Sequence, residues 1–160
     1  MLRLYVETSV WSSLTDRTDP ERRRETRRFL EWCRPRHRLL SSRVVLRELK
    51  GIRDSSLRRN ALRLYESFRK RIVPENPQAE RMARDLIRLG CVTENHLADA
   101  VHLAYTIFAG ADALVTWNMG DLARPHTRMI VRGFCRRNGL PDIRIDSPVE
   151  VARWLGVRIR

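Results

Sequence analysis

Short apolar segments alternate with helix-length segments along most of this chain. Apolar runs occupy residues 2–6, 39–41, 72–73 and 113–116, and a further short run at 143–145 is expected at the sheet edge. The run at 113–116 shows no polar alternation, which is typical of a parallel strand covered on both faces. Strands that alternate with helices predict an α/β fold: a central, mostly parallel sheet in three layers, with helices on both faces.

Helix start and stop signals separate these apolar runs. Asp19, Ser42 and Asp54 stand where N-caps are expected, and Pro20 and Pro77 suit first helical positions. Helices are therefore predicted over about residues 20–33, 43–50, 55–69, 77–89, 95–109, 125–138 and 148–155. The segment 95–109 is apolar on most of its circumference, which predicts a buried helix.

Length and charge limit the possible architectures and partners. The 160 residues contain no repeat and no linker, so a single domain over residues 1–160 is expected. The formal net charge is +13, from 32 Lys and Arg against 19 Asp and Glu. Such a basic surface attracts polyanions such as nucleic acids, although a basic proteome or an acidic protein partner would explain the charge equally well.

Cysteine usage and hydropathy indicate the compartment. Cys33, Cys91 and Cys135 are widely spaced and form no CxxC pair, so reduced and partly buried thiols are expected. The first residues contain no signal-peptide core, and no apolar run approaches the length of a membrane span. We therefore expect a soluble cytoplasmic protein with no membrane association.

Acidic residues stand at several of the positions where a parallel sheet places its functional site. Such sites lie beyond the carboxyl ends of the strands. Glu7 follows the first apolar run, Glu48 lies in the helix after the second, and Asp99 is in the first turn of the apolar helix. Carboxylates gathered without a Cys/His cluster suit Mg²⁺ or Mn²⁺ better than Zn²⁺. Asp99 is the strongest candidate, because an unpaired acid in so apolar a helix would be costly.

Four segments, in chain order, resemble the motifs of PIN domains, and the chain layout resembles VapC-type toxins of toxin–antitoxin pairs. They are LYVETSV at residues 4–10, VVLREL at 44–49, LADAVHLA at 97–104, and ALVTWN at 113–118 with Asp121 and Leu122 beyond it. The first acid of this family is usually Asp, and here it is Glu7. Many relatives carry a fourth Asp where this chain has Asn118, and Asp121 stands nearby.

The resemblance implies a Mg²⁺-dependent endoribonuclease that often forms a homodimer and is inhibited by a cognate antitoxin. Glu7 and Asp99 would bind the metal and Glu48 would orient the attacking water, with all three acids as candidate ligands. Asn118 and Asp121 are further candidate ligands. Thr8 or Ser9 would orient the first carboxylate, with Thr116 as a further supporting hydroxyl. Among the basic segments, Arg22, Arg23 and Arg27 are predicted to hold the RNA backbone.

Other interpretations remain open. A PIN-like fold that only binds RNA or protein is the main alternative, because Glu7 and Asn118 depart from the usual acids. A phosphatase-like enzyme with a covalent aspartate would need an Asp after the first strand, where this chain has Glu7. His102, three residues after Asp99, is expected to have a packing or supporting role.

Overall fold

The computed structural model describes residues 1–159, with the side chain of Glu94 excepted, so the last residue of the predicted 1–160 domain lies outside it. The strands are β1 (Arg3–Val6), β2 (Arg38–Ser42), β3 (Arg71–Val73), β4 (Ala113–Val115) and β5 (Arg144–Asp146). The helices are α1 (Thr8–Ser13), α2 (Pro20–Cys33), α3 (Arg43–Lys50), α4 (Ser55–Ser67), α5 (Pro77–Arg88), α6 (Leu97–Phe108), α7 (Pro125–Arg137) and α8 (Pro148–Trp154), with a 3₁₀ turn at Glu94–His96.

The five strands form one parallel sheet in the order β3-β2-β1-β4-β5. In this order β1 is the central strand, and Tyr5 pairs with Leu40 on one side and Leu114 on the other. All the paired strands run in the same direction. The carboxyl ends of β1, β2 and β4 therefore open onto the same edge of the sheet, which places their following residues side by side.

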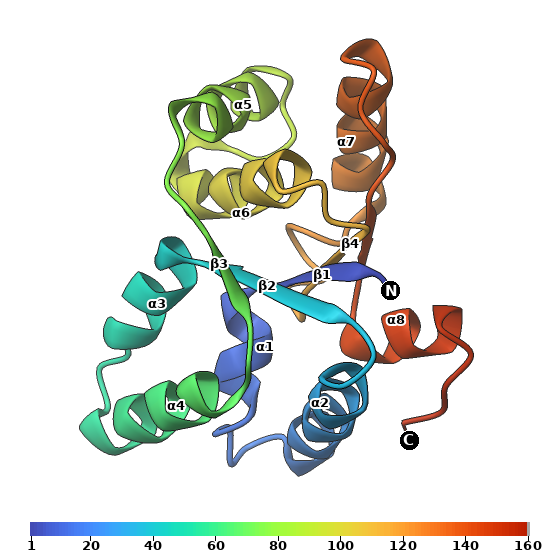
Figure 1. Cartoon of the computed structure of the whole chain (residues 1–160). Helices are drawn as coiled ribbons and strands as arrows, with labels where there is room; N and C mark the ends of the chain where they lie inside the picture. The colour runs from blue at the N-terminus through green and yellow to red at the C-terminus, as the bar shows by residue number, and fades with distance from the viewer. Residues whose placement is uncertain (160) are drawn as a thin grey trace.

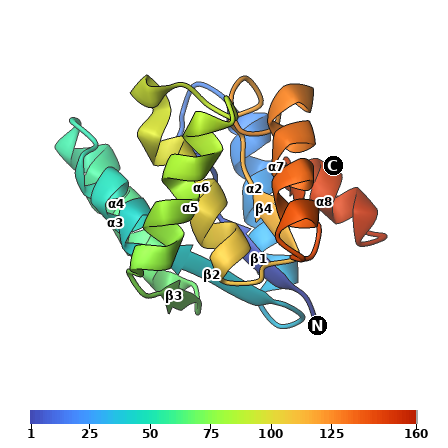
Figure 2. The same cartoon turned by 90° about the horizontal axis from the view of Figure 1, so that it is seen from above.

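Helices cover both faces of the sheet, as the alternation of segments predicts. Figure 1 shows α5, α6 and α7 on one side and α1, α2, α4 and α8 on the other, and Figure 2 gives the same arrangement from above. The three-layer α/β prediction is confirmed. The core between the layers contains fully buried Trp11, Tyr5, Phe29, Leu86 and Leu103.

The three cysteines agree with their prediction. Cys33, Cys91 and Cys135 are free thiols and all are buried, and burial raises their pKa values, that of Cys33 to about 12. Within residues 1–159, every helix is too short or too polar to cross a bilayer.

Local differences from the predicted elements have clear causes. Helix α1 was not predicted, because it is a single short segment whose N-cap is Glu7, a residue type uncommon at that position. Asp19 and Asp54 accept the backbone N–H bonds expected of caps, from Arg22 and Leu57. Ser42 stands at the N-cap of α3 but makes no capping bond, because its hydroxyl pairs with Tyr5 instead.

Candidate functional site

Glu7 is fixed at the end of the central strand by a set of hydrogen-bond donors. It is 6% exposed and caps α1, accepting the Ser9 backbone N–H at Oε1 over 3.0 Å. The Ser9 hydroxyl donates to Oε2, and the Thr116 hydroxyl at the end of β4 donates to the same oxygen over 2.8 Å. These donors hold a buried carboxylate in one orientation, so its position does not depend on a bound ligand.

Glu48 reaches the same place from α3. Its Oε2 accepts the Thr8 hydroxyl and lies 2.9 Å from Nε2 of His102. Burial is the largest single influence on its carboxyl and raises the pKa. The hydrogen bond and charge of His102, aided by Thr8 and Arg47, outweigh burial and hold the pKa of Glu48 below its usual value. Glu48 is thus an ionised acid with fixed partners, although its side chain is half-buried.

His102 lies between the carboxylates, and it is 1% exposed. Nε2 is 2.9 Å from Glu48 Oε2 and 3.9 Å from Glu7 Oε1, while Nδ1 is 3.0 Å from the Tyr5 hydroxyl. Burial alone would lower its pKa. The bond to Glu48 and the charges of Glu7, Glu48 and Asp99 raise the pKa of His102 above its usual value. The surrounding carboxylates therefore favour the protonated imidazole at the centre of the site.

Asp99 lies in the first turn of α6 with a different set of neighbours. Its Oδ1 accepts the Asn118 amide over 3.4 Å, and its Oδ2 is 3.5 Å from Nδ1 of His96. The same His96 nitrogen is 3.4 Å from Asp121 Oδ1, and the Asp121 backbone N–H donates to the side-chain Oδ1 of Asn118 over 3.1 Å. Burial, followed by the negative charge of Glu7, raises the pKa of Asp99.

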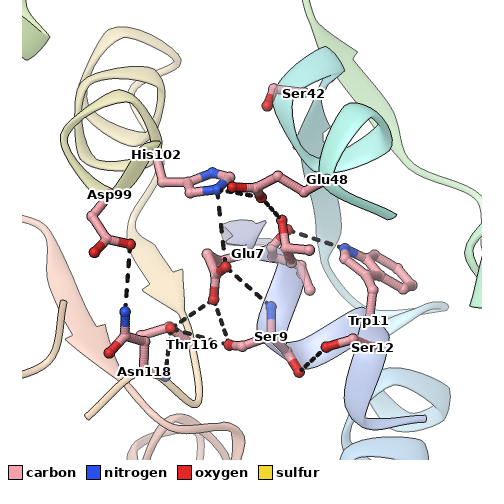
Figure 3. A network of polar contacts seen from close by, with 12 residues as sticks. Glu7, Ser9, Trp11, Ser12, Ser42, Glu48, Asp99, His102, Thr116 and Asn118 are labelled. Carbon is pink, nitrogen blue, oxygen red and sulfur yellow. Dashed lines mark hydrogen bonds and ion pairs between the residues drawn. The ribbon is translucent and has the colours of Figure 1, made fainter. Parts of the chain in front are cut away.

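The ionisable residues thus form two groups, which we call the inner cluster and the outer cluster. The ligand atoms of Glu7, Glu48 and His102, the inner cluster, all lie within 4.8 Å of one another. Those of His96, Asp99 and Asp121, the outer cluster, do so as well. Figure 3 shows Glu48 and Asp99 on opposite sides of Glu7. The two clusters interact electrostatically, since the negative charge of Glu7 raises the pKa of Asp99 and the charges of Glu7 and Asp99 both raise that of His102.

The hydroxyl residues divide between the two acids of the inner cluster. Ser9 and Thr116 contact Glu7, whereas Thr8 contacts Glu48. Ser9 also accepts the backbone N–H of Trp117 over 2.8 Å, and this bond ties the segment after β4 to α1. Sequence reasoning assigned Thr8 or Ser9 to the first carboxylate, Glu7. In the structure Ser9 contacts Glu7, whereas Thr8 contacts Glu48.

The predicted basic residues lie on α2. The Arg22 guanidinium stacks over the Trp117 ring with 5.2 Å to the ring centroid, and it pairs with Asp19 at 3.3 Å. Arg23 is half-buried and Arg27 is exposed. Sequence reasoning missed His96. Its position three residues before Asp99 was the available signal, because residues at this spacing share one side of a helix.

The donors present fit a divalent cation that prefers oxygen. Glu7, Glu48 and Asp99 supply carboxylates, Asn118 supplies an amide oxygen, and Asp121 adds a further carboxylate. Hard oxygen donors of this kind suit Mg²⁺ and Mn²⁺, and the imidazole of His96 in the outer cluster favours Mn²⁺ of the two.

Comparison with known proteins agrees with the arrangement of the sheet. One similar structure is VapBC2 from Rickettsia felis, crystallised with a DNA fragment from its promoter. It superposes with a TM-score of 0.60 and 15% sequence identity, and the match covers 91% of this chain and 98% of that one. The chain has a VapC-like PIN fold. VapC20 from Mycobacterium tuberculosis, a sarcin–ricin loop cleaving toxin, superposes with a TM-score of 0.59 and 19% identity over 75% of this chain and 93% of that one. Neither a protein-family model nor a curated protein sequence matches the chain.

Proposed function

We propose that this protein is a divalent-metal-dependent endoribonuclease in which Glu7, Glu48 and Asp99 hold Mg²⁺ or Mn²⁺. The observation that carries the proposal is the meeting of buried Glu7 with Glu48 beyond the central strands, with Asp99 beside them, in a VapC-like PIN fold. Several carboxylates gathered in one place repel one another, and a bound cation would relieve that repulsion. The net charge of +13 also favours a polyanionic substrate such as RNA over a neutral or cationic one.

The chain's own residues would divide the work of hydrolysis. When bound, the metal would lower the pKa of a coordinated water and neutralise charge on the phosphate. Glu7 and Asp99 would hold it, with the Asn118 carbonyl and Asp121 as additional oxygen donors. Glu48 would orient the attacking water and accept its proton, while His102 and Thr8 keep the Glu48 carboxylate in place.

The test is cleavage of RNA by the wild type and by Asp99→Asn, with Mn²⁺, with Mg²⁺ and with EDTA. We expect metal-dependent cleavage by the wild type and a loss of at least about 100-fold in Asp99→Asn, the upper range for losing a residue that supports a metal. Asp85→Asn is the matched control, because Asp85 lies on α5 and pairs only with Arg88 among the contacts described. Equal rates in the wild type and Asp99→Asn would refute the proposal.

Metal binding itself separates this proposal from a PIN fold that only binds RNA or protein. Calorimetric titration with Mn²⁺ should show specific binding to the wild type and much weaker binding to Glu7→Gln. Saturable RNA binding without any specific Mn²⁺ or Mg²⁺ binding would favour the non-catalytic alternative. In that case His102, whose pKa the surrounding acids raise, would be the permanent partner of Glu7 and Glu48.

The biological partners follow from the same proposal. VapC20 is described as a toxin that cleaves the sarcin–ricin loop, so an RNA carrying that loop is the first substrate to assay.

We also propose that the protein is a cytoplasmic homodimer with a cognate antitoxin, and that residues 1–160 form a single domain. Co-expression with the product of the neighbouring reading frame should yield a complex in which cleavage is inhibited, and light scattering of the free protein should give twice the chain mass.

A further inference from the structure

A cavity of about 450 Å³ opens beside the inner cluster. It lies between α1, the segment that leads into α2, the start of α4 and the residues that follow β4. Ser9 and Asn118 line this cavity. Ser9 also contacts Glu7, and Asn118 also contacts Asp99, so the cavity borders the acidic site at these two residues. Its volume falls within the range of pockets that bind small ligands, about 300–1,000 Å³.

The cavity has a flat aromatic wall that the protein holds rigidly. The Trp117 indole N–H donates to the Thr26 hydroxyl over 2.9 Å, and the Trp117 backbone N–H donates to Ser9. The Arg22 guanidinium lies over the same ring and is itself held by Asp19. Trp117 and Arg22 both line the cavity, and the indole N–H is already satisfied inside the protein. The ring and the guanidinium over it therefore offer the cavity a surface for stacking.

The other lining residues suit a flat ligand with a polar rim. Ile52 and Leu57 add apolar surface, whereas Asp16 and Thr18 are polar. Bonds from the Thr18 hydroxyl and backbone N–H lower the pKa of Asp16, so this residue is a carboxylate that accepts hydrogen bonds. Arg17 and Arg22 line the cavity as well, and both attract a negatively charged strand.

We propose that this cavity binds a nucleobase of the RNA strand beside the cleaved phosphate, stacked against Trp117 and Arg22. The inference rests on the proposed ribonuclease function and extends it to substrate recognition. Stacking on aromatic and guanidinium planes, with polar groups around the edge, is how proteins bind unpaired bases. Through Ser9, a base in the cavity would be coupled to the orientation of Glu7. The cavity would thereby select which nucleotides lie next to the cleavage site.

The direct test is NMR titration of the full-length protein with each of the four nucleoside 5′-monophosphates in EDTA, following the indole N–H signals. The Trp117 signal is assigned by its loss in Trp117→Phe. We expect at least one monophosphate to shift this signal with a Kd near or below about 1 mM, a weak but specific affinity. Ribose 5-phosphate should bind at least about 10-fold more weakly. Equal binding of ribose 5-phosphate, or no shift with any nucleotide, would overturn the proposal.

Two substitutions sharpen this test. Arg22→Gln removes the guanidinium from the Trp117 ring and should weaken nucleotide binding about 10-fold, within the range for loss of a stacking partner. Arg24→Gln, on the same helix but outside the cavity lining, should leave binding within about twofold. Equal losses in Arg22→Gln and Arg24→Gln would show that general charge, and not the cavity, holds the nucleotide, and would overturn the proposal.

A cleavage assay keeps this inference distinct from the proposed function. With RNA substrates that differ only in the bases next to the cut, Arg22→Gln and Leu57→Trp should change the ratio of kcat/KM values between substrates. Nucleotide binding without any cleavage would refute only the ribonuclease. Metal-dependent cleavage without nucleotide binding, with an unchanged base preference in both variants, would refute only the cavity, and a peptide segment of a partner protein would then be its better occupant.

Discussion

The inner and outer clusters are built from similar residues, but the protein holds them differently. In the inner cluster, Glu7 and Glu48 each accept hydrogen bonds from hydroxyls, and buried His102 lies 2.9 Å from Glu48. In the outer cluster, His96 reaches Asp99 and Asp121 only at 3.5 and 3.4 Å, and its side chain is 42% exposed. The inner cluster is therefore organised by the fold, whereas the outer one keeps freedom to adjust around a ligand.

This difference suggests a division of roles. A buried carboxylate with several fixed donors has little to gain from rearrangement, so it sets where a metal would bind. Solvent-facing groups held by long contacts adjust at low cost, so they suit the entrance where substrate arrives. Substitutions in the inner cluster should then change catalysis and stability, whereas substitutions of the exposed outer-cluster residue His96 should mainly change metal affinity.

The largest effect is expected for Glu7→Gln. The amide keeps an oxygen for the Ser9 backbone N–H but loses the negative charge, so cleavage should fall by at least about 100-fold with little change in fold. Rate measurements in Mn²⁺, together with circular dichroism, check this. Glu66→Gln on α4 is the control and should retain wild-type rates. A Glu7→Gln variant as active as the control would remove the inner cluster from the reaction.

The next largest effect concerns stability. His102→Gln removes the buried imidazole that Glu7 and Glu48 favour in its charged form. Breaking a fully buried charge pair typically costs about 3–5 kcal/mol of unfolding free energy, and we expect a smaller loss of about 2–3 kcal/mol because Glu48 is partly exposed. Urea unfolding in EDTA should show this loss, and Mn²⁺ should restore part of it by supplying the missing positive charge. His126→Gln, at an exposed position, should cost about 1 kcal/mol or less. Losses of the same size in both variants would mean that His102 has no special electrostatic role.

A smaller effect, and of a different kind, is expected in the outer cluster. His96→Ala should change the unfolding free energy by no more than about 0.5 kcal/mol, because the side chain is exposed. Its Mn²⁺ affinity, measured by calorimetry, should fall by about 10-fold. If His96→Ala were instead as unstable as His102→Gln, the contrast between the clusters would disappear.

The smallest effect should come from the basic face of α2, which would guide RNA toward the outer cluster. Arg27→Ala should weaken RNA binding modestly and reduce its salt dependence by about 0.7 in the log–log slope, the value for one phosphate contact to a single strand. RNA binding is measured at several salt concentrations in proteins that also carry Asp99→Asn, so that the RNA is not cleaved. Arg84→Ala on α5 is the control. Binding by Asp99→Asn alone that does not vary with salt would exclude phosphate contacts altogether.

Much of the fold was predictable because its signals are local. The buried strands, the caps at Asp19 and Asp54, and the apolar helix around Asp99 all follow from residues close together in the chain. Helix α1 escaped prediction because its N-cap is a Glu whose own donors include Thr116, 109 residues away. The hydroxyl of Ser42 also could not be placed, since it binds Tyr5 from a neighbouring strand.

By itself, the sequence determined that acids would stand at the strand ends. Apolar strands flanked by helices are buried in a parallel sheet, and the residues that follow those strands then lie along its carboxyl edge. Only the tertiary structure decided how those acids group. The packing of α6 against the sheet brings His102 to Glu48, 54 residues away, and the loop after β4 brings Asn118 to Asp99. Glu7, Glu48 and Asp99, which sequence reasoning assigned to one metal site, therefore lie in two coupled clusters. Such long-range contacts depend on the packing of whole elements, which no local pattern of residues encodes.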